Sequence, residues 1–168
     1  MSRVVSTGGK VFAGIAVLAF SACATQPGEI KRAYAASAAA IAKSVVVPAG
    51  YETILLPGMV ADPVTPAASG QPASYGDTET QAESIFKKIA AALSEVGVGE
   101  GDVVAMTVYL VAPATGQAMD FAGMMRAYSR HYGSETQVNR PVRSTVQVAG
   151  LVAPGLLVEI EVTAARKR

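Results

Sequence analysis

The stretch Asp102-Val-Val-Ala-Met-Thr-Val-Tyr-Leu110 decides the fold. With the next residue, its run of β-branched and other apolar side chains predicts a strand over residues 103–111. Helical patterns flank this strand on both sides. On the N-terminal side, Ile85 and Ile89 begin an apolar face with helical spacing, and Gly97 is expected just after the helix end. This part of the sequence therefore predicts a strand between two helices.

The helix before the strand begins near Asp77, where Thr78 and Gln81 have the spacing of a capping box. The helix after the strand is predicted over residues 119–132. It carries an apolar stripe that we expect to pack in the core, made of Phe121, Met124, Met125, Tyr128 and Tyr132. His131 lies off this stripe and is expected to be solvated.

Further strands are expected outside the two helices. Residues 44–47 and 51–56 precede the first helix, and residues 143–148 and 156–163 follow the second. Residues 62–76 are rich in proline and glycine and are expected to form a surface loop. The order β-β-α-β-α-β-β predicts an α+β domain with both helices packed on one face of the sheet. The other face would then lack cover from its own chain, which predicts an oligomer.

The N-terminal residues have the pattern of an export signal. Arg3 and Lys10 precede a short apolar run and small residues, so residues 1–22 are predicted to be a signal peptide. Cys23 follows in the position of a lipidated cysteine, although cleavage before Thr25 is the alternative. We expect residues 23–43 to be a tether and residues 44–168 the domain. The protein is accordingly expected to be a periplasmic lipoprotein anchored at the outer membrane through its N-terminal lipid, or else soluble in the periplasm.

Composition excludes several classes of function. The chain has 168 residues, a net charge of +1 and no basic stripe with interleaved aromatics, so no nucleic-acid partner is expected. One histidine and one cysteine leave too few ligands with suitable spacing for a zinc site, so no metal is expected. They also offer no catalytic pair with a serine or cysteine nucleophile.

Arg143 and Glu159 are the candidate site residues. Arg143 opens a strand after Pro141, where its planar guanidinium is suited to hold a carboxylate, although a surface ion pair is the alternative. Strand alternation places Glu159 and Glu161 on one face of the last strand. That face is either solvated or turned toward an arginine across a subunit interface.

The motifs carry a resemblance to a known family. From about residue 44 to 166, the chain resembles the RidA/YjgF (reactive intermediate deaminase) family. The resemblance lies in Gly76-Asp77 and the helix that follows, in residues 102–110 and 120–128, and above all in Arg140-Pro-Val-Arg-Ser-Thr-Val-Gln-Val148 with Val158-Glu-Ile-Glu161.

The resemblance implies a chorismate-mutase-like sheet, a barrel-like homotrimer and ligand clefts between subunits. It also implies hydrolysis of 2-imino and 2-enamino acids to 2-oxo acids and ammonia, without a cofactor. Arg143 corresponds to the residue that binds the substrate carboxylate, and Glu159 to the one that positions water. Gly58 matches a backbone turn beside the substrate, and Thr145 stands where a cysteine is common.

Two positions differ from the family pattern. The tyrosine of a Gly-Pro-Tyr segment has no match, unless Tyr51 replaces it from elsewhere, and Met125 stands in place of an asparagine. Both differences make the cleft more apolar. The alternative function is therefore a trimer without catalysis that binds a small carboxylate or serves as a scaffold at the cell envelope.

Overall fold

The computed structural model describes residues 28–168. The predicted signal peptide and Cys23 lie outside the described residues. The elements follow the order β1 (Lys31–Ala33), β2 (Ser44–Val46), β3 (Tyr51–Val60), α1 (Thr78–Glu95), the 3₁₀ turn η1 (Glu100–Asp102), β4 (Val103–Leu110), α2 (Phe121–His131), β5 (Val142–Gln147) and β6 (Val158–Lys167). In this part of the chain, the helices fall short of the length and apolar character that crossing a membrane requires.

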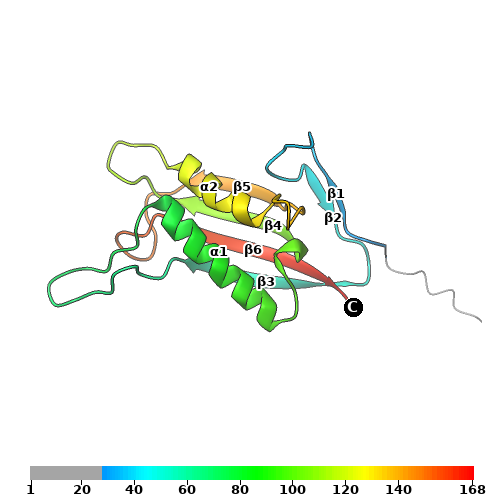
Figure 1. Cartoon of the computed structure of the whole chain (residues 1–168), viewed down its shortest axis with the longest axis horizontal. Helices are drawn as coiled ribbons and strands as arrows, with labels where there is room; N and C mark the ends of the chain where they lie inside the picture. Colours follow the sequence, from blue (N-terminus) through cyan, green and yellow to red (C-terminus); the bar gives the residue numbers. More distant parts are fainter. Residues whose placement is uncertain (1–27) are drawn as a thin grey trace, which may run out of the picture.

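The main sheet has the strand order β3-β6-β4-β5. Its pairs are antiparallel except β4 with β5, which run parallel because α2 provides the crossover between them. Both helices lie across the same face of this sheet (Figure 1). The expected α+β architecture is thus confirmed.

The core lies between the sheet and the two helices. Helix α1 contributes Ile85, Phe86, Ile89 and Leu93, all of which are fully buried. Alternate side chains of β4 and β6, among them Val108 and Ile160, belong to the same core cluster. Met124 and Tyr128 of α2 and Tyr132 at its C-cap are buried as the apolar stripe predicted, whereas Phe121 is 42% exposed.

The start of α1 differs from the predicted capping box. The cap is Asp77, whose Oδ1 accepts a hydrogen bond from the Thr80 backbone N–H at 2.8 Å. Gln81 is instead fully buried and joins two loops to the helix. Its amide donates to the carbonyls of Gly76 and Gly155 at 3.1 and 2.9 Å and accepts from the Leu157 N–H at 2.7 Å. At the other end, Gly97 has a φ of 76° and closes the helix as expected.

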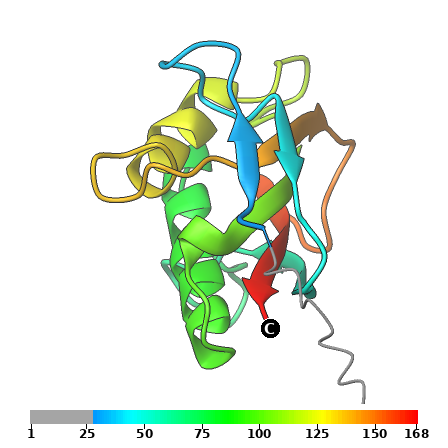
Figure 2. The ribbon, with the colours of Figure 1, turned by 90° about the vertical axis from the view of Figure 1, so that its right-hand side faces the viewer.

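Residues 31–43, which we assigned to a tether outside the domain, are packed against it. Strand β1 pairs with β2, and the two strands stand beside one end of the main sheet (Figure 2). Arg32 reaches from β1 to donate to the carbonyls of Gly101 and Val103 at 2.9 and 3.2 Å. The Tyr128 hydroxyl donates to the Ala40 carbonyl at 2.9 Å. These long-range bonds place the start of the folded domain at or before residue 31.

The second face of the main sheet is mixed rather than purely apolar. Leu55 is 73% exposed and Val146 is 43% exposed, as expected for a face without cover from its own chain. Polar side chains share the same face, because Thr107 pairs in register with Glu161 and Tyr109 with Glu159. A hollow of about 260 Å³ opens there, bordered by Leu55, Thr107 and Glu161.

Candidate functional site

Arg143 lies on edge strand β5, beneath helix α2. It pairs in register with Met106, which is buried on the helix side of the sheet, so its side chain points toward α2. The guanidinium carbon lies 4.3 Å from the centre of the Tyr128 ring and 5.7 Å from that of Phe121. The guanidinium thus sits against two aromatic rings of the helix.

The polar atoms around Arg143 lack strong partners. Within residues 28–168, its Nη2 donates to the thioether sulfur of Met125 alone, at 3.1 Å, and its Nη1 is buried without a hydrogen-bond partner. Thr145, two residues along the same strand face, also has a buried hydroxyl without a partner in the described part of the chain. Burial lowers the pKa of Arg143, and the neighbouring Tyr128 opposes this effect only in part. Two buried donors without partners in residues 28–168 thus lie on the same face of β5, and an anion can accept hydrogen bonds from such donors.

Glu159 lies on β6 next to the irregular turn of β3. The register of β3 against β6 shifts between Leu56 and Met59, so Pro57 and Gly58 bulge from the ladder. A Cβ atom added to Gly58 would overlap the carboxylate of Glu159. The absence of a side chain at Gly58 therefore makes room for Glu159.

The two groups of residues lie on opposite faces of the sheet. Arg143 and Thr145 share the helix side with Met106 and Val108, to which they are paired. Glu159 pairs with Tyr109, which alternation turns to the other side. One copy of the chain thus brings Arg143, Thr145 and Met125 together, and separately Glu159 with Gly58, but it does not bring the first group to the second.

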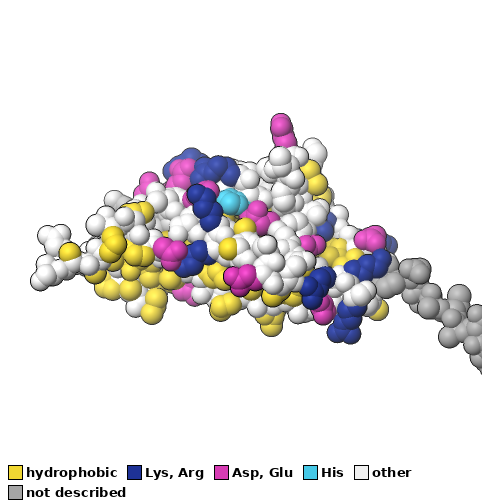
Figure 3. Space-filling view, turned by 60° about the horizontal axis from the view of Figure 1, so that its bottom comes forward, with side chains coloured by type: hydrophobic (Ala, Val, Ile, Leu, Met, Phe, Trp, Pro, Cys, Tyr) yellow, Lys and Arg dark blue, Asp and Glu magenta, His cyan; other side chains and the backbone are white. Residues whose placement is uncertain are grey.

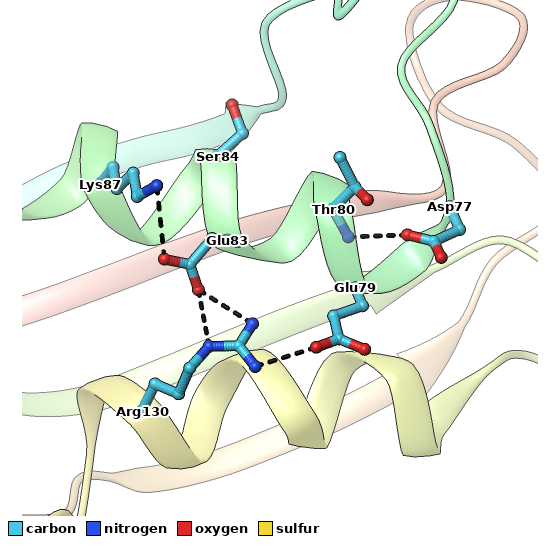
Figure 4. Close-up of a pocket in the computed structure, with 7 residues that line it drawn as sticks. All are labelled: Asp77, Glu79, Thr80, Glu83, Ser84, Lys87 and Arg130. Carbon is cyan, nitrogen blue, oxygen red and sulfur yellow. Dashed lines mark hydrogen bonds and ion pairs between the residues drawn. The ribbon is translucent and has the colours of Figure 1, made fainter.

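A groove of about 640 Å³ lies elsewhere, on the outer side of the helices (Figure 4). Its charged side chains already satisfy one another. Arg130 of α2 bridges Glu79 and Glu83 of α1 at 2.9 and 3.1 Å, and Lys87 lies 3.6 Å from Glu83. We therefore regard this groove as an ion-pair network that joins the helices, not as the reactive site.

His131 takes part in that network, contrary to the expectation that it is solvated. Its side chain is 14% exposed, and its ring nitrogens lie 2.8 Å from Glu100 and 3.3 Å from Glu83. Burial alone would lower the pKa of His131, but the bonds and charges of Glu100 and Glu83 outweigh it and raise the pKa. Figure 3 shows the single histidine among acidic and basic side chains. In residues 28–168, no group of acidic, histidine or cysteine side chains is arranged to hold a metal ion.

The family model described as Endoribonuclease L-PSP matches residues 35–166. The chain belongs to this family. Because this is the RidA/YjgF family, the resemblance drawn from the motifs is confirmed, and the match begins within the segment that packs against the domain.

Relatives within the RidA/YjgF family agree with this assignment. A RutC family protein of Pyrococcus abyssi is 35% identical over 89 residues, which are 53% of this chain and 62% of that protein, so the match spans less than two thirds of that relative. A Rid family protein from Yersinia pestis, YyfB, shares the fold with a TM-score of 0.57 at 22% identity, over 74% of this chain and 86% of that one. E. coli TdcF, crystallised with bound serine, is 30% identical with a TM-score of 0.52, over 68% of this chain and 81% of that one.

The sequence placed Phe121, Met125 and Tyr128 in the core with Met124, which is correct for Tyr128, but it did not predict that these side chains surround Arg143. Their spacing of i, i+4 and i+7 was a usable signal. It defines a row on α2 that is distinct from Met124, and that row is the one facing Arg143.

Proposed function

We propose that this RidA/YjgF protein is a homotrimer that binds small carboxylates between subunits and hydrolyses 2-imino and 2-enamino acids there. The observation that carries the proposal is the buried guanidinium of Arg143: among the described residues, its Nη1 has no hydrogen-bond partner and its Nη2 has only a thioether. A carboxylate accepts two parallel N–H bonds from such a group. Serine, the ligand in the related TdcF structure, carries a carboxylate of this kind.

The positions of Arg143 and Glu159 in the fold support a cleft between subunits. Glu159 and Arg143 lie on opposite faces of one sheet, so a cleft that contains both needs the Glu159 face of one copy beside the β5 edge of another. On the mixed face that carries Glu159, Leu55 and Val146 are exposed in a single copy. In the proposed trimer each copy contributes Arg143 to one cleft and Glu159 to the next.

The proposed chemistry follows from these groups. Arg143 holds the substrate carboxylate, and the Thr145 hydroxyl donates beside it. The Glu159 carboxylate accepts a hydrogen bond from a water molecule and takes its proton as the oxygen adds to the imine carbon. The carbon–nitrogen bond then breaks with the electron pair leaving on a protonated nitrogen, so that one water and one imine give one 2-oxo acid and one ammonia. None of these steps draws on a cofactor.

Turnover of freshly generated 2-iminopropanoate, followed by release of ammonia and pyruvate, tests the proposal. Arg143→Ala should lower the specificity constant by about 10- to 150-fold, because it removes a charge-assisted contact of roughly 1.5–3 kcal/mol. Arg126→Ala is the matched control, since that arginine of α2 is exposed and pairs with Glu79. Wild-type turnover no faster than buffer would refute the deaminase.

The roles of the two carboxylates on β6 separate catalysis from binding. Glu159→Gln should lose turnover while keeping carboxylate affinity. Glu161→Gln should retain turnover, because the Tyr109 hydroxyl that donates to Glu161 at 3.1 Å can donate equally to an amide oxygen. Carboxylate binding that depends on Arg143, without turnover by the wild type, would instead establish the alternative function as a binding protein.

We further propose that the protein is exported and lipidated at Cys23, as a periplasmic lipoprotein of the outer membrane. The support is the basic, apolar and small-residue succession that ends at the chain's single cysteine. Growth with a clickable fatty acid should label the wild type and leave Cys23→Ser unlabelled. An unlabelled wild type recovered from the periplasm would favour ordinary signal cleavage.

A further inference from the structure

We propose that the Arg143 half of the site selects carboxylates with an uncharged, apolar substituent, and that Met125 and Phe121 are its specificity-determining residues. The inference rests on the proposed function, since it takes Arg143 as the carboxylate anchor. It adds the chemical class of the rest of the ligand.

The first observation is that a methionine covers the guanidinium. The sulfur of Met125 lies 3.1 Å from Nη2 of Arg143, where a carboxylate oxygen would sit. A thioether is a weak acceptor, so a carboxylate displaces it readily. The methionine side chain has three rotatable bonds, and it can withdraw without a change in the backbone of α2.

The second observation is the mostly apolar character of the described groups around the guanidinium, with the Thr145 hydroxyl as the polar exception. The guanidinium contacts the Met125 thioether and lies over the rings of Tyr128 and Phe121. Phe121 is 42% exposed, so one part of its ring is free to contact a ligand. A ligand carboxylate at Arg143 therefore has its α-substituent next to apolar atoms.

These two observations together determine the preference. When Met125 withdraws from Arg143, its methyl and sulfur need a new apolar neighbour, and an alkyl or aromatic substituent of the ligand provides one. A second carboxylate on the ligand would lose its hydration against the same atoms without gaining a partner there. Met125 and Phe121 thus favour ligands with one carboxylate and an apolar remainder.

A ladder of stable carboxylates tests the inference without any imine chemistry. Acetate, propanoate, butanoate and pentanoate are titrated into the purified protein, and binding is followed by ligand-observed NMR. Affinity should rise roughly fourfold for each added methylene, which is the burial of one CH₂ at about 0.8 kcal/mol. Succinate, which differs from butanoate by a terminal carboxylate, should bind at least about tenfold more weakly than butanoate.

Substitutions assign the preference to its residues. Met125→Gln should reduce the rise to less than about twofold per methylene, whereas Met125→Leu should keep it. Met119→Gln is the matched control. Met119 lies just before α2, its backbone N–H donates to Gln147 at 2.9 Å, and the methionine sulfur that accepts from Arg143 within residues 28–168 is that of Met125. This variant should leave the ladder unchanged.

The possible failures are distinguishable. If no carboxylate binds to the wild type, the proposed function fails, and this inference fails with it. If carboxylates bind and Arg143→Ala abolishes their binding, but affinity is flat along the ladder or succinate equals butanoate, only this inference is refuted. The inference would also be overturned if Met125→Gln unfolded at the same temperature as the wild type and showed the same rise in affinity per methylene.

Discussion

The pH dependence of stability should report on His131. A neutral imidazole has only one N–H, whereas the two carboxylates that contact this ring can only accept. Both contacts are satisfied together only by the imidazolium. Because folding raises the pKa of His131, the resulting stabilisation is fully present below the unfolded pKa of about 6.5. It is lost as the pH rises through the pKa of the folded protein.

The magnitude follows from the geometry. Deprotonation removes one of two charge-assisted bonds, each of roughly 1.5–3 kcal/mol, and the longer contact of 3.3 Å and partial exposure of the site reduce that value. We expect the free energy of unfolding to fall by about 1–2 kcal/mol above the transition, which lowers the midpoint temperature by roughly 3–6 °C for a domain of this size.

Thermal unfolding followed by circular dichroism between pH 5.5 and 8.5 measures this effect. His131 is the chain's single histidine, so few other side chains change charge in this range. His131→Gln should unfold at a temperature that is nearly constant across the same range. Identical pH profiles for the two proteins would refute the imidazolium assignment, and so would a wild type that becomes more stable as the pH rises.

Two further substitutions follow from the described contacts. Gly58→Ala should lower turnover at least tenfold without loss of folding, because the added Cβ displaces the carboxylate of Glu159. Steady-state kinetics measures the turnover, and the midpoint temperature of thermal unfolding checks that the variant is folded. Gln81→Leu should lower the free energy of unfolding by about 3 kcal/mol or more, since it leaves two carbonyls and one N–H without their partner in the interior. Urea unfolding measures this change. A decrease below about 1 kcal/mol would contradict the role assigned to Gln81.

Local patterns were sufficient for most of the fold. Strand β4 and helices α1 and α2 each have an apolar pattern that extends over eight or more residues. Patterns of this length predict an element even before its tertiary contacts are known. Strand β1 has three residues and an alanine-rich sequel, so no periodicity can define it. It forms by pairing with β2, and its place against the domain depends on bonds from Arg32 to Gly101 and Val103, partners distant in sequence that only the folded chain brings near.

The roles of Arg143 and Glu159 in the site stay predictions, and the sequence did not define where the two lie relative to each other within one copy of the chain. Arg143 and Glu159 were identified by their motifs, yet the side of the sheet that each faces depends on strand register. Register is set by pairing between β4, β5 and β6, which the sequence of one strand does not contain. His131 was misjudged for a related reason, since Glu83 and Glu100 reach it from separate elements.

The placement of Arg143 and Glu159 on opposite faces has a genetic consequence. In the proposed trimer, two inactive proteins can restore each other, because a subunit with Glu159→Gln still offers Arg143 to a neighbour with Arg143→Ala that still offers Glu159. Refolding the two variants together at equal amounts should rebuild a complete cleft at about a quarter of the interfaces. A variant that carries both Arg143→Ala and Glu159→Gln offers neither residue to a neighbour, so mixing it with wild type should only lower the activity. In a cell, the two alleles would complement each other although neither supports activity alone.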